Sequence, residues 1–174
     1  FRFDRAANAL YHFLWDEFCD WYLEIAKAYL ADATHAPAAR AVLLRVLDSS
    51  LRLLHPFMPF VTEEIWQKLP HDGPTIMKAA FPTGTEAESG AVAEMTPLME
   101  LVTAIRTIRA EKGVDPKRRI DVSVVAPAGR SLLDAEAAWI RSLGRIERLE
   151  ILSAPPPEAP QTIKQQVGPW QVLI

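Results

Sequence analysis

The sequence predicts a mainly α protein, a bundle of helices followed by a small β-α-β-β appendage. In the first two-thirds of the chain, apolar side chains recur at steps of three and four residues, as on amphipathic helices. Gly113 and Pro116 end that pattern, and apolar and polar residues then alternate over 119–125, as in a half-buried strand. The 174 residues, 49% of them hydrophobic, suffice to bury a core. We expect a helical-bundle domain over 1–112 and an α/β subdomain over 113–174.

The helices of the expected bundle follow from the positions of the apolar stripes and of proline. We expect four of them, over residues 2–31, 37–54, 59 to about 69, and 91–112. The first has Tyr11 and Trp15 off its main apolar stripe, so it is apolar on more than one side and should have neighbours on two sides. Gly113 fits the position that follows a helix, and Pro116 prevents the helix from resuming.

The remaining segments are predicted from turn residues and from alternation. A connector over 71–90 is rich in Pro, Gly and Thr, and its residues 78–82 should lie extended over the bundle. In the appendage we expect strands over 119–125, 146–152 and 167–174, a helix over 129–143 closed by Gly144, and a Pro-rich link over 154–160.

The most specific motif of the chain is the run LLHPFMPFVTEEIW over 53–66. Proline is tolerated at a first helical position, and it pushes the preceding residue out of the helical region. Pro56 and Pro59 therefore predict a fixed bend between two helices, with Phe57 and Phe60 beside it. The two glutamates that follow fall in the first turn of the next helix, where the helix dipole favours negative charge.

This run resembles the corresponding segment of valyl-tRNA synthetases, in the helical domain that binds the anticodon. The run WDEFCDWYLE over 15–24 resembles a second segment of the same family. Isoleucyl and leucyl enzymes have related bundles, and they differ in the Cys-Asp-Trp-Tyr run and in the Met-Pro-Phe turn. The resemblance extends in order and spacing over most of the chain.

The resemblance implies a cytoplasmic tRNA-binding domain that recognises the anticodon stem-loop of valine tRNA. The equivalent domain of an isoleucyl- or leucyl-tRNA synthetase is an alternative. The parent protein would be a valine–tRNA ligase that uses ATP and Mg, with catalytic domains outside this chain. The chain opens inside a helical pattern without Met, so we expect a piece of a longer protein that stops before a C-terminal coiled-coil arm.

Candidate RNA-binding residues lie on the second helix and at the bend. They are Arg40, Arg45 and Arg52, followed by Phe57 and Phe60. Arginine can bind phosphates and base edges, and aromatic side chains stack on unstacked bases. The alternative is a solvated helix face with two phenylalanines in the core.

For Arg52 the two interpretations make different predictions. If Arg52 contacts the anticodon loop, Arg52→Ala should weaken tRNA binding by roughly 1–3 kcal/mol and barely change the melting temperature. If Arg52 instead pairs with Asp48, four residues back on the same helix, tRNA affinity should not change. The first outcome is the expectation from sequence.

A second basic cluster surrounds the end of the fourth helix. Arg106, Arg109 and Lys112 share one helix face, and Lys117, Arg118 and Arg119 follow in the next loop. These residues could contact the tRNA backbone, which positions a protein without reading sequence. Alternatively, they are cations favoured by the negative end of a helix dipole.

The sequence contains no motif for catalysis. It lacks a Gly-rich phosphate loop, a Cys-x-x-Cys pair and a nucleophile elbow, as well as the HIGH and KMSKS signatures of class I synthetases. Four polar residues at four-residue steps on the first helix, His12 to Glu24, could face a metal, but a solvated stripe shows the same spacing. We expect no catalytic residue, no metal and no cofactor in this chain.

Composition limits the possible partners further. The net charge of −3 argues against a generally basic, DNA-binding protein, so RNA contact must come from local patches. The single cysteine suits a reducing compartment, and no apolar run is long enough to span a membrane. The rival function is a helical protein-interaction module, in which Tyr11, Trp15 and Trp66 form a groove for a partner.

Overall fold

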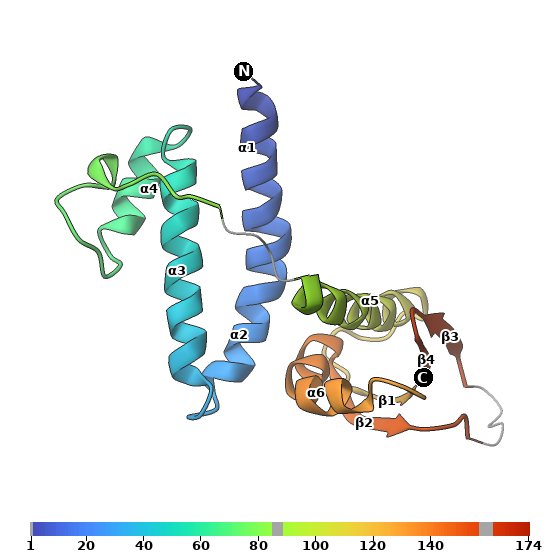
Figure 1. The fold of residues 1–174 in the computed structure, drawn as a ribbon. Coiled ribbons are helices and arrows are strands. Elements are labelled where there is room, and N and C mark those ends of the chain that lie inside the picture. Colours follow the sequence, from blue (N-terminus) through green and yellow to red (C-terminus); the bar gives the residue numbers. More distant parts are fainter. Residues whose placement is uncertain (1, 85–88, 157–161) are drawn as a thin grey trace. The chain divides into compact units, whose positions relative to one another are not determined.

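The computed structural model describes residues 2–84, 89–156 and 162–174, and the chain divides into two compact units (Figure 1). Unit 1 comprises Phe1–Thr85 and is helical, and unit 2 comprises Glu86–Ile174 and contains all strands of the described residues. Residues 85–88 of the expected connector and 157–160 of the expected Pro-rich link lie outside the described residues. The mainly α fold with a small mixed sheet is confirmed.

The first long helix of the prediction is one helical run with a change of winding in its middle. It consists of α1 (Phe3–His12), a π-helical segment (Phe13–Tyr22) and α2 (Leu23–Leu30). The predicted stripe faces inward, with Phe18 and Ile25 buried. The π-helical segment contains most of the WDEFCDWYLE motif, and such segments are rare and frequent at functional sites.

The second and third helices are α3 (Ala36–Leu54) and α4 (Pro59–Trp66), which pack against each other. Proline occupies the first turn of both helices, where its missing N–H costs no hydrogen bond. The helix α4 ends three residues before the predicted Leu69, because residues 67–69 form turns instead.

The core of unit 1 beside the bend joins three segments that are distant in sequence. Leu51 of α3, Trp66 of α4 and Ile76 of a short 3₁₀ turn (Ile76–Lys78) are buried together, with Ala79 packed against them. The predicted connector therefore crosses over α3 and α4, as Figure 1 shows. Burying these side chains against one another holds the connector in place.

The fourth predicted helix is α5 (Ser89–Glu111), and it belongs to unit 2. Its apolar residues Leu98, Leu101, Val102 and Ile105 are fully buried, and the helix packs against α6 and β3. The boundary expected between 112 and 113 separates a helical pattern from a mixed one. The compact units divide instead between Thr85 and Glu86, because the apolar face of α5 covers the sheet.

The helix α5 ends as the sequence predicts. Gly113 adopts a φ of +61° and donates its N–H to the carbonyl of Ala110, while Val114 donates to Arg109. These two bonds form a Schellman motif, in which a left-handed glycine satisfies the last carbonyls of a helix.

The sheet of unit 2 has four strands in the order β2-β1-β4-β3. They are β1 (Ile120–Val125), β2 (Ile146–Leu152), β3 (Lys164–Val167) and β4 (Trp170–Leu173). The strands β1 and β2 are parallel and are connected through α6 (Arg130–Gly144), whereas β4 is antiparallel to both β1 and β3. Parallel neighbours need such a crossover.

Two details of the appendage differ from the prediction. The strand expected over 167–174 is a hairpin of β3 and β4, turning at Gly168 and Pro169, where Gly168 has a φ of +52°. The residue that closes α6 in the left-handed conformation is Arg145, with a φ of +50°, and not Gly144. Gly144 is needed for packing, because a Cβ there would lie 2.9 Å from Cδ1 of Ile146.

Candidate nucleic-acid interface

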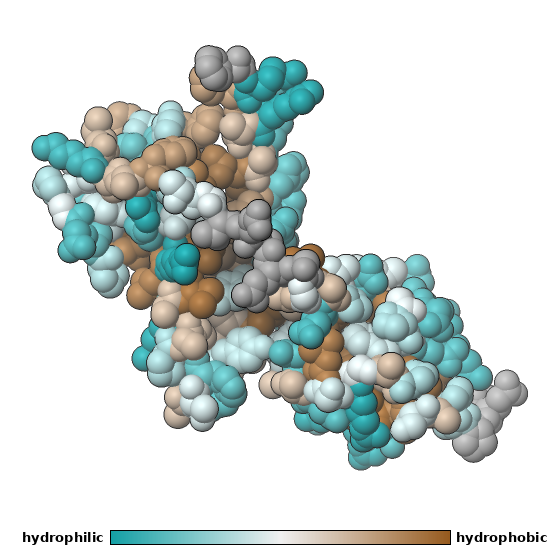
Figure 2. All heavy atoms as spheres, viewed as in Figure 1, coloured by the Kyte–Doolittle hydropathy of each residue, from teal (hydrophilic) through white to brown (hydrophobic). Residues whose placement is uncertain are grey.

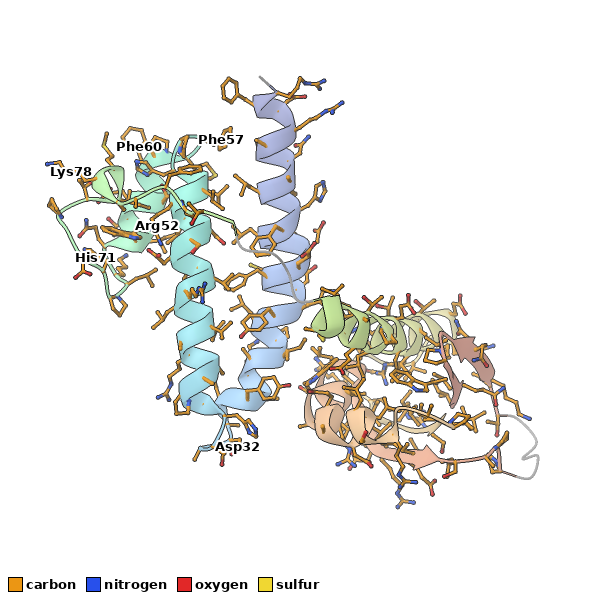
Figure 3. All side chains as sticks on the ribbon, in the orientation of Figure 1. Asp32, Arg52, Phe57, Phe60, His71 and Lys78 are labelled. Atoms are coloured by element: carbon orange, nitrogen blue, oxygen red, sulfur yellow. The ribbon has the colours of Figure 1, made fainter. Side chains whose placement is uncertain are left out.

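The bend between α3 and α4 exposes aromatic side chains at one end of unit 1 (Figure 3). Phe60 is 90% exposed and Phe57 is 38% exposed, and Met58 and Val61 beside them are also exposed. Both phenylalanines are therefore at the surface of the described chain, and Phe60 is not a core residue. A cluster of exposed apolar side chains of this kind indicates a binding site.

Hydrogen bonds inside the bend hold its shape. The hydroxyl of Thr62 donates to the carbonyl of Met58 at 2.8 Å, and Nδ1 of His55 lies 2.8 Å from the same hydroxyl oxygen. Because the hydroxyl has one proton, we infer that His55 donates its Nδ1–H to Thr62. His55 therefore has a structural role, and the two phenylalanines project from a rigid turn.

Two of the three candidate arginines on α3 are free to bind a ligand. Arg40 and Arg45 are exposed, and among the described residues neither side chain has a hydrogen bond or an ion pair. Arg45 lines an open surface pocket of about 410 Å³ together with Phe13 and Leu53. It lies nine residues before Leu54, which is about 14 Å along the helix axis from the start of the bend.

The third arginine, Arg52, is engaged in the fold. Its side chain is 24% exposed, its Nη2 donates to Oδ2 of Asp48, and its Nη1 donates to the carbonyl of Ala80 at 2.9 Å. The other oxygen of Asp48 accepts a hydrogen bond from the indole of Trp66 at 2.7 Å. Arg52 and Asp48 thus link α3 to α4 and to the connector, which is the alternative interpretation from sequence.

Arg52 also borders a second surface pocket. This pocket of about 330 Å³ has Trp66 and His71 in its wall, with ring centroids 3.9 Å apart. Nε of Arg52 is buried without a hydrogen-bond partner in the described structure. Figure 3 shows Arg52 and His71 on the connector side of unit 1, below the bend.

Glu63 fastens the connector to α4. Its carboxylate accepts hydrogen bonds from Gln67 at 2.7 Å, from the hydroxyl of Thr75 at 2.7 Å and from the backbone N–H of Ile76 at 3.1 Å. These bonds, that from Gln67 first, lower the pKa of the Glu63 carboxyl below its usual value, because they stabilise the charged form. The first turn of α4 contains no acidic residue, so the expected placement of the two glutamates there is wrong, and Glu63 instead holds the connector.

The basic residues around the end of α5, like the arginines of α3, include some that the fold uses and some that stay exposed. Arg109 is 7% exposed, and its guanidinium donates to the carbonyls of Asp115 and Arg118 at 3.1 and 2.7 Å and to that of Arg145 at 3.5 Å. Arg106 is exposed, but its Nε donates to the carbonyl of Leu143 at 3.0 Å. Lys112 is exposed, and its side chain has no hydrogen bond or ion pair among the described residues.

The polar stripe of the first helix forms pairs along the helix. Nδ1 of His12 lies 2.7 Å from Asp16, and Lys27 pairs with Glu24 at 2.5 Å. In the described part of the chain, no three His, Cys, Asp or Glu side chains are grouped so that they could hold a metal ion.

One of the three residues expected to form a groove for a partner protein is not at the surface. Trp66 is buried in the core of unit 1, whereas Tyr11 and Trp15 are exposed and stack on each other with nearly parallel rings. None of the described helices has the length and apolar content that a membrane span requires.

The sequence did not single out the exposed apolar residues around the bend. Val61 and Ile65 of α4 are exposed beside Met58. Met77 and Phe81 are also exposed, but they lie on the connector and are not part of the bend. Figure 2 shows apolar side chains on this part of unit 1, whereas the visible face of unit 2 is mainly hydrophilic. A count of apolar residues could not find this surface, because it does not distinguish exposed from buried positions.

Known proteins resemble the chain over both units. The family model described as the anticodon-binding domain of tRNA ligase matches residues 1–124. Valine–tRNA ligases of Carboxydothermus hydrogenoformans and Thermotoga maritima are 45% and 40% identical to the chain over 161 and 158 residues, 90% of its length in each case. That of Geobacter sulfurreducens is 44% identical over 87% of the chain.

The matched segments cover 18% of the length of each of these three ligases. The match to the family model includes α1 to α5 and most of β1, and thus the bend with its two exposed phenylalanines. The chain belongs to the family of anticodon-binding domains of tRNA ligases.

Proposed function

We propose that the chain is the tRNA-binding part of a valine–tRNA ligase and that the bend in unit 1 receives unstacked anticodon bases of valine tRNA. The observation that carries this proposal is the 90% exposure of Phe60 on a turn fixed by Pro59 and Thr62. A large aromatic side chain held in water on a rigid turn is ready to stack on a base.

The role of each residue follows from its chemistry. Phe57 and Phe60 offer ring faces for stacking, which contributes roughly 1–3 kcal/mol per base. Arg40 and Arg45 lie on α3, are exposed and have no partner among the described residues, so each can bind phosphate or a base edge. We assign tRNA binding to this chain and no chemical step.

The names of the relatives support the choice of valine tRNA and of a larger ligase as the parent, and we place that parent in the cytoplasm. In such a parent, ATP and Mg would belong to a catalytic domain. The chain would supply specificity to chemistry that takes place elsewhere in the parent.

The proposal is tested with the variant Phe60→Ala. Binding of the 174-residue chain to valine tRNA, measured by fluorescence anisotropy, should weaken by roughly 1–3 kcal/mol as one stacking contact is lost. Affinity for a valine tRNA with a swapped anticodon should change less, because an anticodon that the bend does not accept brings no base to the Phe60 ring. The matched control is Phe81→Ala, since Phe81 is 66% exposed but lies on the connector.

Two results would contradict the proposal. One is equal affinity of the parent chain for the two tRNAs, which would exclude anticodon recognition by this chain alone. The other is an effect of Phe81→Ala as large as that of Phe60→Ala, which would indicate general apolar contact without a stacking site at the bend.

A further inference from the structure

We propose that unit 2 carries a separate binding site for the phosphate backbone of RNA, formed by Lys112, Lys117, Arg118, Arg119 and Arg145 and held in shape by the buried Arg109. We call these five exposed residues the basic patch. The proposal rests on the proposed function in taking tRNA as the ligand, but it assigns to unit 2 a contact that does not read the anticodon.

Arg109 brings three segments of the chain together. Its guanidinium donates hydrogen bonds to the backbone carbonyls of Asp115, Arg118 and Arg145, which lie in the loop after α5 and at the end of α6. The carbonyl of Arg145 also accepts the N–H of Ile120 at 3.3 Å. The backbones of Arg118 and Arg145, 27 positions apart in sequence, are thus held by hydrogen bonds to one buried side chain.

The side chains of the basic patch remain at the surface. All five residues are exposed. Arg119 donates to the carbonyl of Ile146 at 3.4 Å and lies 3.9 Å from Glu147, a long ion pair between exposed groups. Among the described residues, the other four side chains have neither a hydrogen bond nor an ion pair.

The stabilisation of helix ends does not explain these cations. The end of α5 is closed by the Schellman motif at Gly113, and Arg106 and Arg109 donate to the carbonyls of Leu143 and Arg145 at the end of α6. Backbone N–H groups therefore satisfy carbonyls at the end of α5, and the two arginines bind carbonyls at the end of α6. The four exposed cations without partners are not needed for that purpose.

Charge is concentrated at this place although the whole chain is acidic. Arg109 and the basic patch contribute six cations, against four carboxylates on the same segments, those of Glu111, Asp115, Asp121 and Glu147. One oxygen of Asp115 already accepts the N–H of Lys117 at 2.7 Å. A local excess of arginine and lysine on a fixed frame suits a row of phosphates, which binds through charge without reading sequence.

Arg145 stands in a backbone conformation that would favour glycine. Its φ of +50° is uncommon for a residue other than glycine. A glycine would adopt this conformation with less strain, and it would remove a cation from the patch. Arg145 thus closes α6 and exposes a guanidinium, while its backbone carbonyl shares the Arg109 side chain with that of Arg118.

The test is a comparison of two double variants of the 174-residue chain. Arg118→Gln/Arg145→Gln removes two cations from the basic patch. It leaves the bonds of Arg109 in place, because those bonds use the backbone carbonyls. The control, Arg130→Gln/Lys164→Gln, removes two exposed cations of unit 2 outside the patch. Circular dichroism melting curves check that both variants remain folded.

Binding to valine tRNA and to the anticodon-swapped tRNA is measured over a series of KCl concentrations. For the patch variant, the slope of log affinity against log salt should become shallower by about 1.5, since each phosphate contact contributes about 0.7–0.9. At low salt, affinity should fall roughly tenfold or more for both tRNAs by the same factor. The control variant should keep the parental slope.

Each other outcome has a distinct meaning. A patch variant with the parental slope would overturn the proposal and leave an acidic protein surface as the partner to seek. A loss confined to valine tRNA would also overturn it, because the patch would then read the anticodon. If the parent chain does not discriminate between the tRNAs but the patch variant has the shallower slope, the proposed function fails and the phosphate site stands.

Discussion

The two units differ in what they expose. Of the fourteen large apolar side chains exposed in the described residues, only Val92 belongs to unit 2. Unit 2 instead exposes the basic patch around the end of α5. Unit 1 is therefore suited to stacking on bases, and unit 2 to contacting phosphates.

Net charge does not reveal this difference. Residues 1–85 contain 8 Lys and Arg against 10 Asp and Glu, and residues 86–174 contain 11 against 12, so both units are slightly acidic. What distinguishes them is which charged groups the fold leaves without partners. In both units the fold uses arginines of a basic row, Arg52 in unit 1 and Arg106 and Arg109 in unit 2.

The largest expected effect of a single substitution is that of Arg109→Met on unit 2. Methionine fills similar space but cannot donate to the three carbonyls, so the free energy of unfolding should fall by about 3 kcal/mol. Urea unfolding monitored by circular dichroism measures the change, and amide hydrogen exchange should locate it around residues 112–120. Arg118→Met, at an exposed position, should have almost no effect. Equal stability of the two variants would contradict the role of Arg109.

A smaller effect is expected for Arg52→Ala in unit 1. Removal of the guanidinium leaves Asp48 half-buried with Trp66 as its remaining partner. The free energy of unfolding should fall by about 1–2 kcal/mol. Arg45→Ala, on the same face of α3, should leave stability unchanged and weaken tRNA binding. Unfolding and tRNA titration of both variants measure this. If Arg52→Ala weakened tRNA binding without changing stability, the expectation from sequence for Arg52 would be correct after all.

Periodicity predicted the helices and most of the strands because each element buries one face. The bounds of α3 and β2 agree with the prediction to within one residue. The hairpin of β3 and β4 was missed because its turn, Gly168-Pro169, lies inside a short apolar run. The assignment of α5 to unit 2 could not be derived, since periodicity shows that a helix has an apolar face but not which element covers it.

The candidate site could be predicted only in part, because residue type and spacing do not show which partner a side chain finds in the fold. Residue type and spacing found the arginines and the bend, but they could not separate Arg45, which is exposed, from Arg52, which binds Asp48 and Ala80. They also could not find that the backbone carbonyls of Arg118 and Arg145 bind the same guanidinium, that of Arg109. That arrangement depends on a hydrogen bond network around Arg109, which joins backbone atoms far apart in sequence.

The most direct test of the roles proposed for the two units combines the bend variant with the patch variant. Affinities for valine tRNA and the anticodon-swapped tRNA are measured at one salt concentration for the parent, for Phe60→Ala, for Arg118→Gln/Arg145→Gln and for the combination. We predict that Phe60→Ala reduces discrimination, that the patch variant weakens both tRNAs equally, and that the two effects add to within about 0.5 kcal/mol. Altered discrimination in the patch variant, or equal weakening of both tRNAs by Phe60→Ala, would contradict the account.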